Sequence, residues 1–255
     1  MEIKSKNITP VLVILYLLPW GIQCLVNTFM PIYVASLPYG DAKCVSQVIA
    51  VGAVITVISQ LIWSKWADHS KNKSDILCLS LVLLGGVSLV FLKQDISKIM
   101  LMVIVILFYS AYLPHQPIID TIVSEKYMQT NNSFGWYRSF ASFGFAAMGI
   151  VYAFLPGRTA NSFFIYVCIM AFLSAAAAKM IVAEPVLKEN EGHTETKTIN
   201  KSFVLFLIYT VLVYICASGS QTFFPVYYTS TDGLGGRMEN YGVIISIGTF
   251  IEWGI

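Results

Sequence analysis

Asn27-Thr-Phe-Met-Pro-Ile-Tyr-Val-Ala-Ser36 returns later in the chain as Gln221-Thr-Phe-Phe-Pro-Val-Tyr-Tyr-Thr-Ser230. Five of the ten positions are identical (Thr, Phe, Pro, Tyr and Ser), and three more are similar. Each copy lies near the end of a long apolar segment, and the second begins 194 residues after the first (221 minus 27). This distance leaves room for six membrane-spanning helices, so the repeat indicates a duplicated six-helix unit of the kind found in transporters.

The composition of the chain is that of an integral membrane protein. Hydrophobic residues make up 56% of the 255 residues and charged residues 12%, whereas a soluble domain has roughly 25% charged residues. The mean hydropathy is +0.70. The net charge of +2 is small and no basic run is dense, so nucleic acid is not expected as a partner.

Seven apolar segments are long enough to cross a bilayer, which takes about 20 residues, and an eighth has begun when the chain ends. No segment shows the polar and apolar alternation of a membrane barrel, so we expect an all-α membrane protein. On this interpretation the chain stops inside its eighth helix. The expected helices are residues 9–37, 45–64, 76–92, 99–123, 135–155, 162–182, 202–229 and 240–255.

One connection, residues 183–201, is long, polar and rich in Glu and Lys. It divides the chain into an N-terminal six-helix bundle at 1–182 and the first two helices of an incomplete C-terminal bundle at 202–255. Eleven of the 16 Lys and Arg residues fall on the side of the amino terminus, which by the positive-inside rule is cytoplasmic. We therefore expect a multi-pass protein of the cell (inner) membrane with a cytoplasmic linker.

The five cysteines are scattered and mostly lie in apolar segments, which is typical of small core residues and indicates neither disulfides nor a metal site. The sequence offers no nucleophile with an adjacent base and no phosphate-binding loop. We therefore expect no enzymatic activity, no catalytic residue, no metal and no cofactor.

Three ionisable residues, Asp120, Arg138 and Glu252, fall inside the expected spans. A charge at the centre of a bilayer costs about 2.5 to 3.5 kcal/mol on insertion scales, so such residues are functional candidates. Asp120 follows Pro114-His-Gln-Pro117, which should kink its helix because two backbone donors are missing. The short connection at 124–134 makes the flanking helices antiparallel neighbours, which would let Asp120 and Arg138 pair.

Polar and aromatic side chains also recur at helical spacing. Tyr16, Trp20, Gln23 and Asn27 form one stripe, and Tyr214, Ser218 and Gln221 repeat three of its positions in the second copy. Tyr109, Tyr112, Gln116 and Asp120 form another stripe. Such stripes either pack helices together or line a cavity, and both interpretations stay open for these residues.

The segment Ser64-Lys-Trp-Ala-Asp-His-Ser-Lys-Asn-Lys73 resembles the loop signature of the major facilitator superfamily, G-x-x-x-D-[RK]-x-G-x-[RK]. Asp68 and Lys73 match the pattern, while Ser64, His69 and Lys71 depart from it. The resemblance implies the major facilitator fold, and it gives Asp68 and Lys73 a role in the conformational switch.

A second resemblance is more specific. Pro117-Ile-Ile-Asp120 and the stretch from Phe134 to Ala146 are similar to the branch that holds the sugar, nucleoside and phenylpropionate proton symporters. In the sugar symporters an acidic residue and an arginine bind substrate and an aromatic ring stacks on it. By position these roles would fall to Asp120, Arg138 and Phe145, although Phe145 stands where the family pattern prefers tryptophan.

Glu252 resembles the acidic residue of the eighth helix that couples substrate to protons in that branch. The resemblance implies a monomeric transporter in the lipid bilayer that carries a small polar or aromatic solute with protons by alternating access. The solute would be held by Gln116, Asn27, Gln23, Trp20 and Gln221 besides the residues named above. A seven-helix receptor and an inactive truncated transporter are the alternatives.

Overall fold

The computed structural model describes residues 8–70, 72–93, 95–155, 159–181 and 201–253. Within these ranges the chain forms nine α-helices and one short 3-10 helix, and no strand. The all-α prediction is therefore confirmed for the described residues. The helices are α1 (Ile8–Ala35), α2 (Ala42–His69), α3 (Lys73–Val90), α4 (Lys98–Tyr112), α5 (His115–Lys126), η2 (Tyr127–Gln129), α6 (Phe134–Phe154), α7 (Phe163–Lys179), α8 (Lys201–Thr229) and α9 (Met238–Trp253).

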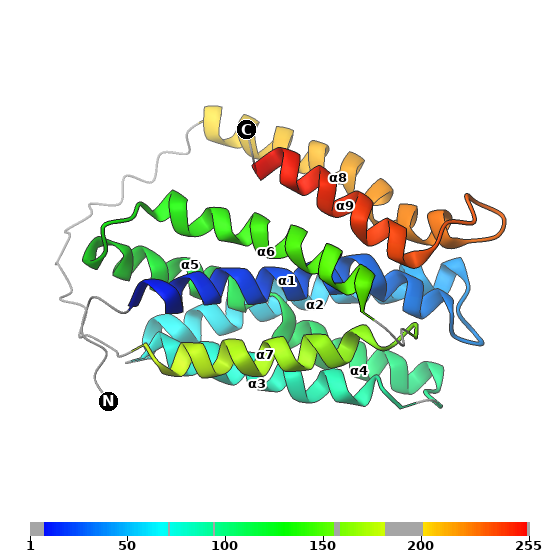
Figure 1. Ribbon diagram of the computed structural model, residues 1–255, viewed down its shortest axis with the longest axis horizontal. Helices are drawn as coiled ribbons and strands as arrows, with labels where there is room; N and C mark the ends of the chain where they lie inside the picture. The colour runs from blue at the N-terminus through cyan, green and yellow to red at the C-terminus, as the bar shows by residue number, and fades with distance from the viewer. Residues whose placement is uncertain (1–7, 71, 94, 156–158, 182–200, 254–255) are drawn as a thin grey trace.

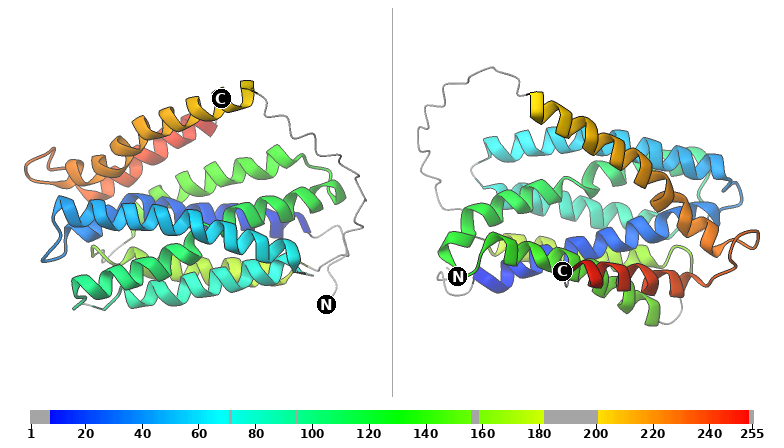
Figure 2. Two further views of the ribbon diagram at one scale, coloured as in Figure 1. Left: turned by 180° about the vertical axis from the view of Figure 1, so that it is seen from behind. Right: turned by 90° about the horizontal axis from the view of Figure 1, so that it is seen from above.

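The helices run back and forth along one long axis (Figure 1). Helices α1 to α7 form one bundle, and α8 and α9 lie together along one side of it (Figure 2). The contacts between the two groups are made chiefly by α6 with α9 and by α1 with α8. The predicted linker at 183–201 falls almost wholly outside the described residues.

Side-chain caps fix where several helices begin. The carboxylate of Asp41 accepts the backbone N–H of Cys44 at 2.6 Å at the start of α2. Asn72 and Ser97 do the same for α3 and α4, and the Ser133 hydroxyl accepts the N–H of Trp136 at 3.2 Å in α6. Each cap satisfies a backbone donor that has no partner inside its own helix.

The span expected at 99–123 is a single apolar segment that is broken in the middle. Helix α4 ends at Tyr112 and α5 begins at His115, so the break coincides with Leu113 and Pro114. The predicted kink is confirmed. Its cause is the loss of backbone N–H groups at two prolines within four residues.

The interior of the bundle contains two apolar clusters. One is rich in aromatic side chains, among them Phe91 and Phe164, whose rings stack at 4.2 Å between centroids. The other gathers aliphatic residues such as Leu12, Leu77 and Ile119 from α1, α3 and α5. Polar side chains of α1 lie along the helix between these two clusters.

Four helical segments are long and apolar enough to cross a membrane: Ile8–Ala35, Ala42–His69, Lys73–Val90 and Lys98–Gln129. Shorter apolar helices cover Phe163–Lys179, Lys201–Cys216 and Asn240–Ile251. Apolar side chains are exposed on the outside of α2, where Leu61 is 70% exposed. Exposed apolar surface of this kind is what lipid tails cover in a multi-pass membrane protein.

Candidate functional site

Three hydrogen bonds join polar side chains of α1 to the broken helix α4–α5. Tyr16 donates its hydroxyl to Asp120 Oδ1 at 2.6 Å. Gln116 Nε2 donates to Gln23 Oε1 at 2.8 Å. Tyr112 donates its hydroxyl to Asn27 Oδ1 at 3.3 Å. We call these six residues the polar row.

The polar row brings together the two stripes that the sequence shows. Positions 16, 23 and 27 of α1 meet positions 120, 116 and 112 in reverse order, as two antiparallel helices should. Tyr109, the remaining member of the second stripe, packs over Gly52 of α2 instead. The break after Tyr112 therefore leaves the rest of the stripe on the face that meets α1.

Asp120 lies at the charged end of the polar row. Its Oδ2 lies 3.6 Å from Nη1 of Arg138, so the predicted ion pair forms. The side chains are 31% exposed for Asp120 and 61% exposed for Arg138. Arg138 opens onto the surface of the bundle, whereas the bond from Tyr16 is short and comes from a buried ring. An exposed guanidinium beside a carboxylate has free donors for a polar solute.

Aromatic rings fill the space next to the row. The Trp20 ring packs against Tyr16 with 5.0 Å between ring centroids, and it meets His115 edge-on at 6.4 Å. His115 is fully buried, and neither of its ring nitrogens has a hydrogen-bond partner in the described part of the chain. Trp20 is half-buried, so one face of its ring borders the row.

The other predicted solute contacts lie outside the row. Phe145 is half-buried on α6, two turns after Arg138. Gln221 lies in α8 and Glu252 in α9, but their side chains fall outside the described residues. Helix α9 itself is placed by Phe250, whose ring meets Phe143 of α6 at 5.9 Å. Residue 252 thus comes two residues after a ring contact between α9 and α6, the helix that carries Arg138.

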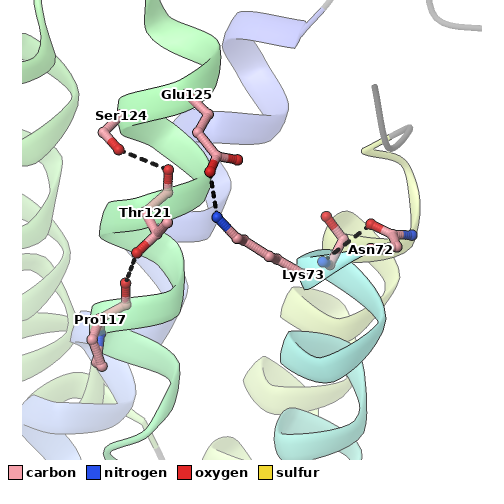
Figure 3. Close-up of polar contacts among 7 residues, drawn as sticks. Asn72, Lys73, Pro117, Thr121, Ser124 and Glu125 are labelled. Atoms are coloured by element: carbon pink, nitrogen blue, oxygen red, sulfur yellow. Dashed lines mark hydrogen bonds and ion pairs between the residues drawn. The ribbon is translucent and has the colours of Figure 1, made fainter. Parts of the chain in front are cut away.

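The segment expected as a loop is mostly helical: Asp68 lies in the last turn of α2, and Lys73 is the first residue of α3. The two residues form a polar group separate from the polar row. Lys73 makes an ion pair with Glu125 of α5, which Figure 3 shows beside the Thr121 and Ser124 hydroxyls. Asp68 is exposed and lines, with Lys73, a small cavity of about 100 Å³ between α2, α3 and α5. This group and the polar row share only helix α5.

Tyr16, Tyr112 and Glu125 are polar partners that sequence reasoning did not place in a site, although Tyr112 belongs to the second stripe. Tyr16 belongs to the α1 stripe, so its helical spacing was a usable signal. Glu125 lies just over one turn after Asp120, but only the fold shows that it meets Lys73. Among the described residues no group of three or more His, Cys, Asp or Glu side chains could hold a metal ion.

The described residues thus form an all-helical bundle with long apolar helices and a row of paired polar side chains between them. The model of the MFS_1 like family matches residues 11–254, and the chain belongs to this family. The resemblance to the major facilitator superfamily is thus confirmed.

Two known proteins are similar to this chain. The uncharacterized transporter YwbF of Bacillus subtilis strain 168 is 22% identical over 232 residues, which cover 88% of this chain and 56% of that protein. The crystal structure of the nucleoside transporter NupG matches with a TM-score of 0.69 at 16% identity, over 96% of this chain and 64% of that one. The chain therefore spans less than two thirds of the length of these two proteins.

Proposed function

We propose that this protein is a secondary active transporter that carries a small polar or aromatic solute, such as a sugar, a nucleoside or an aromatic acid, together with protons. The observation that supports this proposal is the polar row with its charged end at Asp120 and Arg138. Buried hydrogen-bonding groups between membrane helices are costly unless they are paired. Because the Arg138 guanidinium at the end of the row is exposed, a solute can replace part of its contact with Asp120.

The proposed mechanism is alternating access between two helix bundles. The first comprises residues 1–182, and residues 202–255 belong to the second. Asp120 and Arg138 would orient the solute, with Gln116, Gln23, Asn27 and Trp20 beside them. Phe145 would stack on a ring of the solute, and Gln221 would approach from the other bundle. Glu252 would couple solute occupancy to a proton. The packing of α9 on α6 supports this arrangement, because it brings the helix of Glu252 to the helix of Arg138.

Uptake into proteoliposomes tests the proposal, with a panel of solutes and with or without an imposed pH gradient. Arg138→Ala removes the cation and Glu252→Gln removes the titratable proton site without changing shape. We expect each variant to lower uptake at least about tenfold, because each removes a charge that the proposed mechanism requires. Lys179→Ala is the matched control: this exposed cation pairs with Asp75 at 2.5 Å, away from the row.

Unchanged uptake in both Arg138→Ala and Glu252→Gln would remove the proposed site. Loss in Arg138→Ala with an unaltered pH-gradient dependence in Glu252→Gln would keep the solute site and remove the proton coupling. The distribution of basic residues supports a cytoplasmic amino terminus. We propose that the protein lies in the cell (inner) membrane. We propose a monomer, which size measurement in detergent would test.

A further inference from the structure

The break between α4 and α5 leaves two backbone carbonyls without their helical donors. In an α-helix the N–H of residue 114 would bond to the carbonyl of Ser110, but Pro114 has no N–H. The indole Nε1 of Trp63, on α2, donates to that carbonyl at 2.9 Å. A side chain of a neighbouring helix therefore supplies the donor that the proline lacks.

The second proline also removes a helical donor, but the carbonyl concerned keeps a backbone partner and Gln60 adds a second, longer bond. Residue 117 would bond to the carbonyl of Leu113, and Pro117 again has no N–H. The amide Nε2 of Gln60 donates to the Leu113 carbonyl at 3.5 Å, and the backbone N–H of Gln116 reaches the same oxygen at 3.2 Å. Gln60 and Trp63 are three residues apart, so both donors come from one face of α2.

A carbonyl without a donor is costly inside a membrane segment, so a broken helix needs such partners. Two donors that match two prolines one by one also fix the direction of the segment beyond the break. That segment, α5, carries Gln116 and Asp120 of the polar row.

We infer that Trp63 and Gln60 are positioning residues of the candidate site. Their side chains bond to the carbonyls of the break, and the break sets how α5 presents Gln116 and Asp120 to α1. The Trp63 bond is the shorter of the two, so Trp63 carries the larger share. The inference rests on the proposed function only in treating Gln116 and Asp120 as solute contacts.

Cross-linking between α1 and α5 measures this positioning without any solute. In a background with the five native cysteines replaced, Q23C/Q116C puts thiols at two positions whose native side chains are hydrogen-bonded at 2.8 Å. A short bifunctional methanethiosulfonate should cross-link this pair rapidly. Trp63→Phe keeps an aromatic side chain, although a smaller one than indole, and removes the N–H. We expect cross-linking about three- to tenfold slower, the effect of one net hydrogen bond.

The prolines provide a rescue that is specific to each pair. Pro114 has φ −59° and ψ −22°, and Leu113 has φ −94° and ψ −12°, so an alanine at 114 fits the helical backbone and offers an N–H to Ser110. W63F/P114A should therefore cross-link at the parent rate, and W63F/P117A should not. Gln60→Leu should show a smaller loss that P117A restores and P114A does not.

Trp66→Phe is the matched control, because Trp66 lies on the same helix, is half exposed and packs its ring on that of Trp63. An unchanged cross-linking rate in Trp63→Phe would overturn the inference. Equal rescue by P114A and P117A would also overturn it, because removal of either proline would then simply relax the helix. If Trp63→Phe does not fold, recovery of folded protein by P114A but not by P117A gives the same decision. Paired rescue in a protein that transports nothing would keep the positioning role and reject the proposed function.

Discussion

Asp120 holds two unequal partners. The Tyr16 hydroxyl lies 2.6 Å from one carboxylate oxygen, while the Arg138 guanidinium lies 3.6 Å from the other and is 61% exposed. A salt bridge of this length and exposure contributes little to stability. Tyr16 therefore fixes the carboxylate, and Arg138 stays free to bind an incoming group.

Tyr16→Phe tests this division of roles. The variant keeps the buried ring and loses the donor to Asp120, so the carboxylate can swing toward Arg138 and compete with the solute. We expect the apparent KM for uptake to rise about fivefold with little change in the maximal rate, the effect of about 1 kcal/mol. Tyr39→Phe is the control, because its hydroxyl bonds to the Ile96 carbonyl in a loop; an equal rise in KM there would contradict the assignment.

At the scale of helices, α6 has backbone-to-backbone contact with α1. A Cβ atom on Gly144 would lie 2.2 Å from the carbonyl oxygen of Leu17, so only glycine lets the two helices approach this closely. This approach sets the distance between Arg138 on α6 and Asp120, which α1 holds through Tyr16.

Gly144→Ala should therefore destabilise the protein. We expect a loss of about 1 to 3 kcal/mol, as for other overpacked sites, measured as a lower thermal midpoint by circular dichroism. Gly86→Ala on α3 is the control, since a Cβ atom there would have nothing within 4 Å, and its midpoint should stay level or rise. Similar midpoints for the two variants would show that α1 and α6 can separate freely.

The ion pair between Lys73 and Glu125 joins the start of α3 to the end of α5. If the connection between α2 and α3 takes part in the conformational switch, reversing the charge of Lys73 should slow transport. We expect Lys73→Glu to lower the maximal uptake rate about five- to tenfold and K73E/E125K to restore at least half of it, because the pair is re-formed in reverse. A double variant no better than the single one would assign the effect to Lys73 alone.

The order of the helices could be predicted from hydropathy alone. The Asp120 to Arg138 pair could also be predicted from the sequence, for a different reason. A connection as short as 124–134 forces the two flanking helices to be neighbours. The bond between Tyr16 and Asp120 joins residues 104 positions apart. Which residues meet there depends on the axial register of α1 relative to α5. Periodicity gives the face of a helix but not this register, which is why Glu125, Trp63 and Gln60 were not predicted as partners.

For the whole molecule, α9 packs closely on the first bundle at Gly149 of α6. A Cβ atom there would lie 2.2 Å from the Ser246 hydroxyl oxygen and 2.9 Å from the Gly242 carbonyl oxygen. Further along the same pair of helices, Phe143 meets Phe250. Gly149 thus leaves no spare room between α6 and α9.

Gly149→Val should push α9 off α6 and block any cycle that needs this closed contact. We expect uptake to fall at least about tenfold while helix content by circular dichroism is preserved, because α1 to α7 keep their own core. Gly248→Val on α9 is the control, since nothing lies within 4 Å of the place its Cβ atom would take. Normal uptake in Gly149→Val would mean that the two groups of helices work without this contact.

The first half of α8 has a consequence for how the protein is made. Consecutive residues around the whole helix are exposed there, with Phe206 at 60% and Tyr214 at 71%. The Thr210 hydroxyl bonds to its own backbone at Phe206, so it needs no neighbour. This segment can leave the translocon and enter lipid by partitioning alone. Its insertion during synthesis would not have to wait for a packing partner, and the Lys201 ammonium at its head would stay at the lipid headgroups.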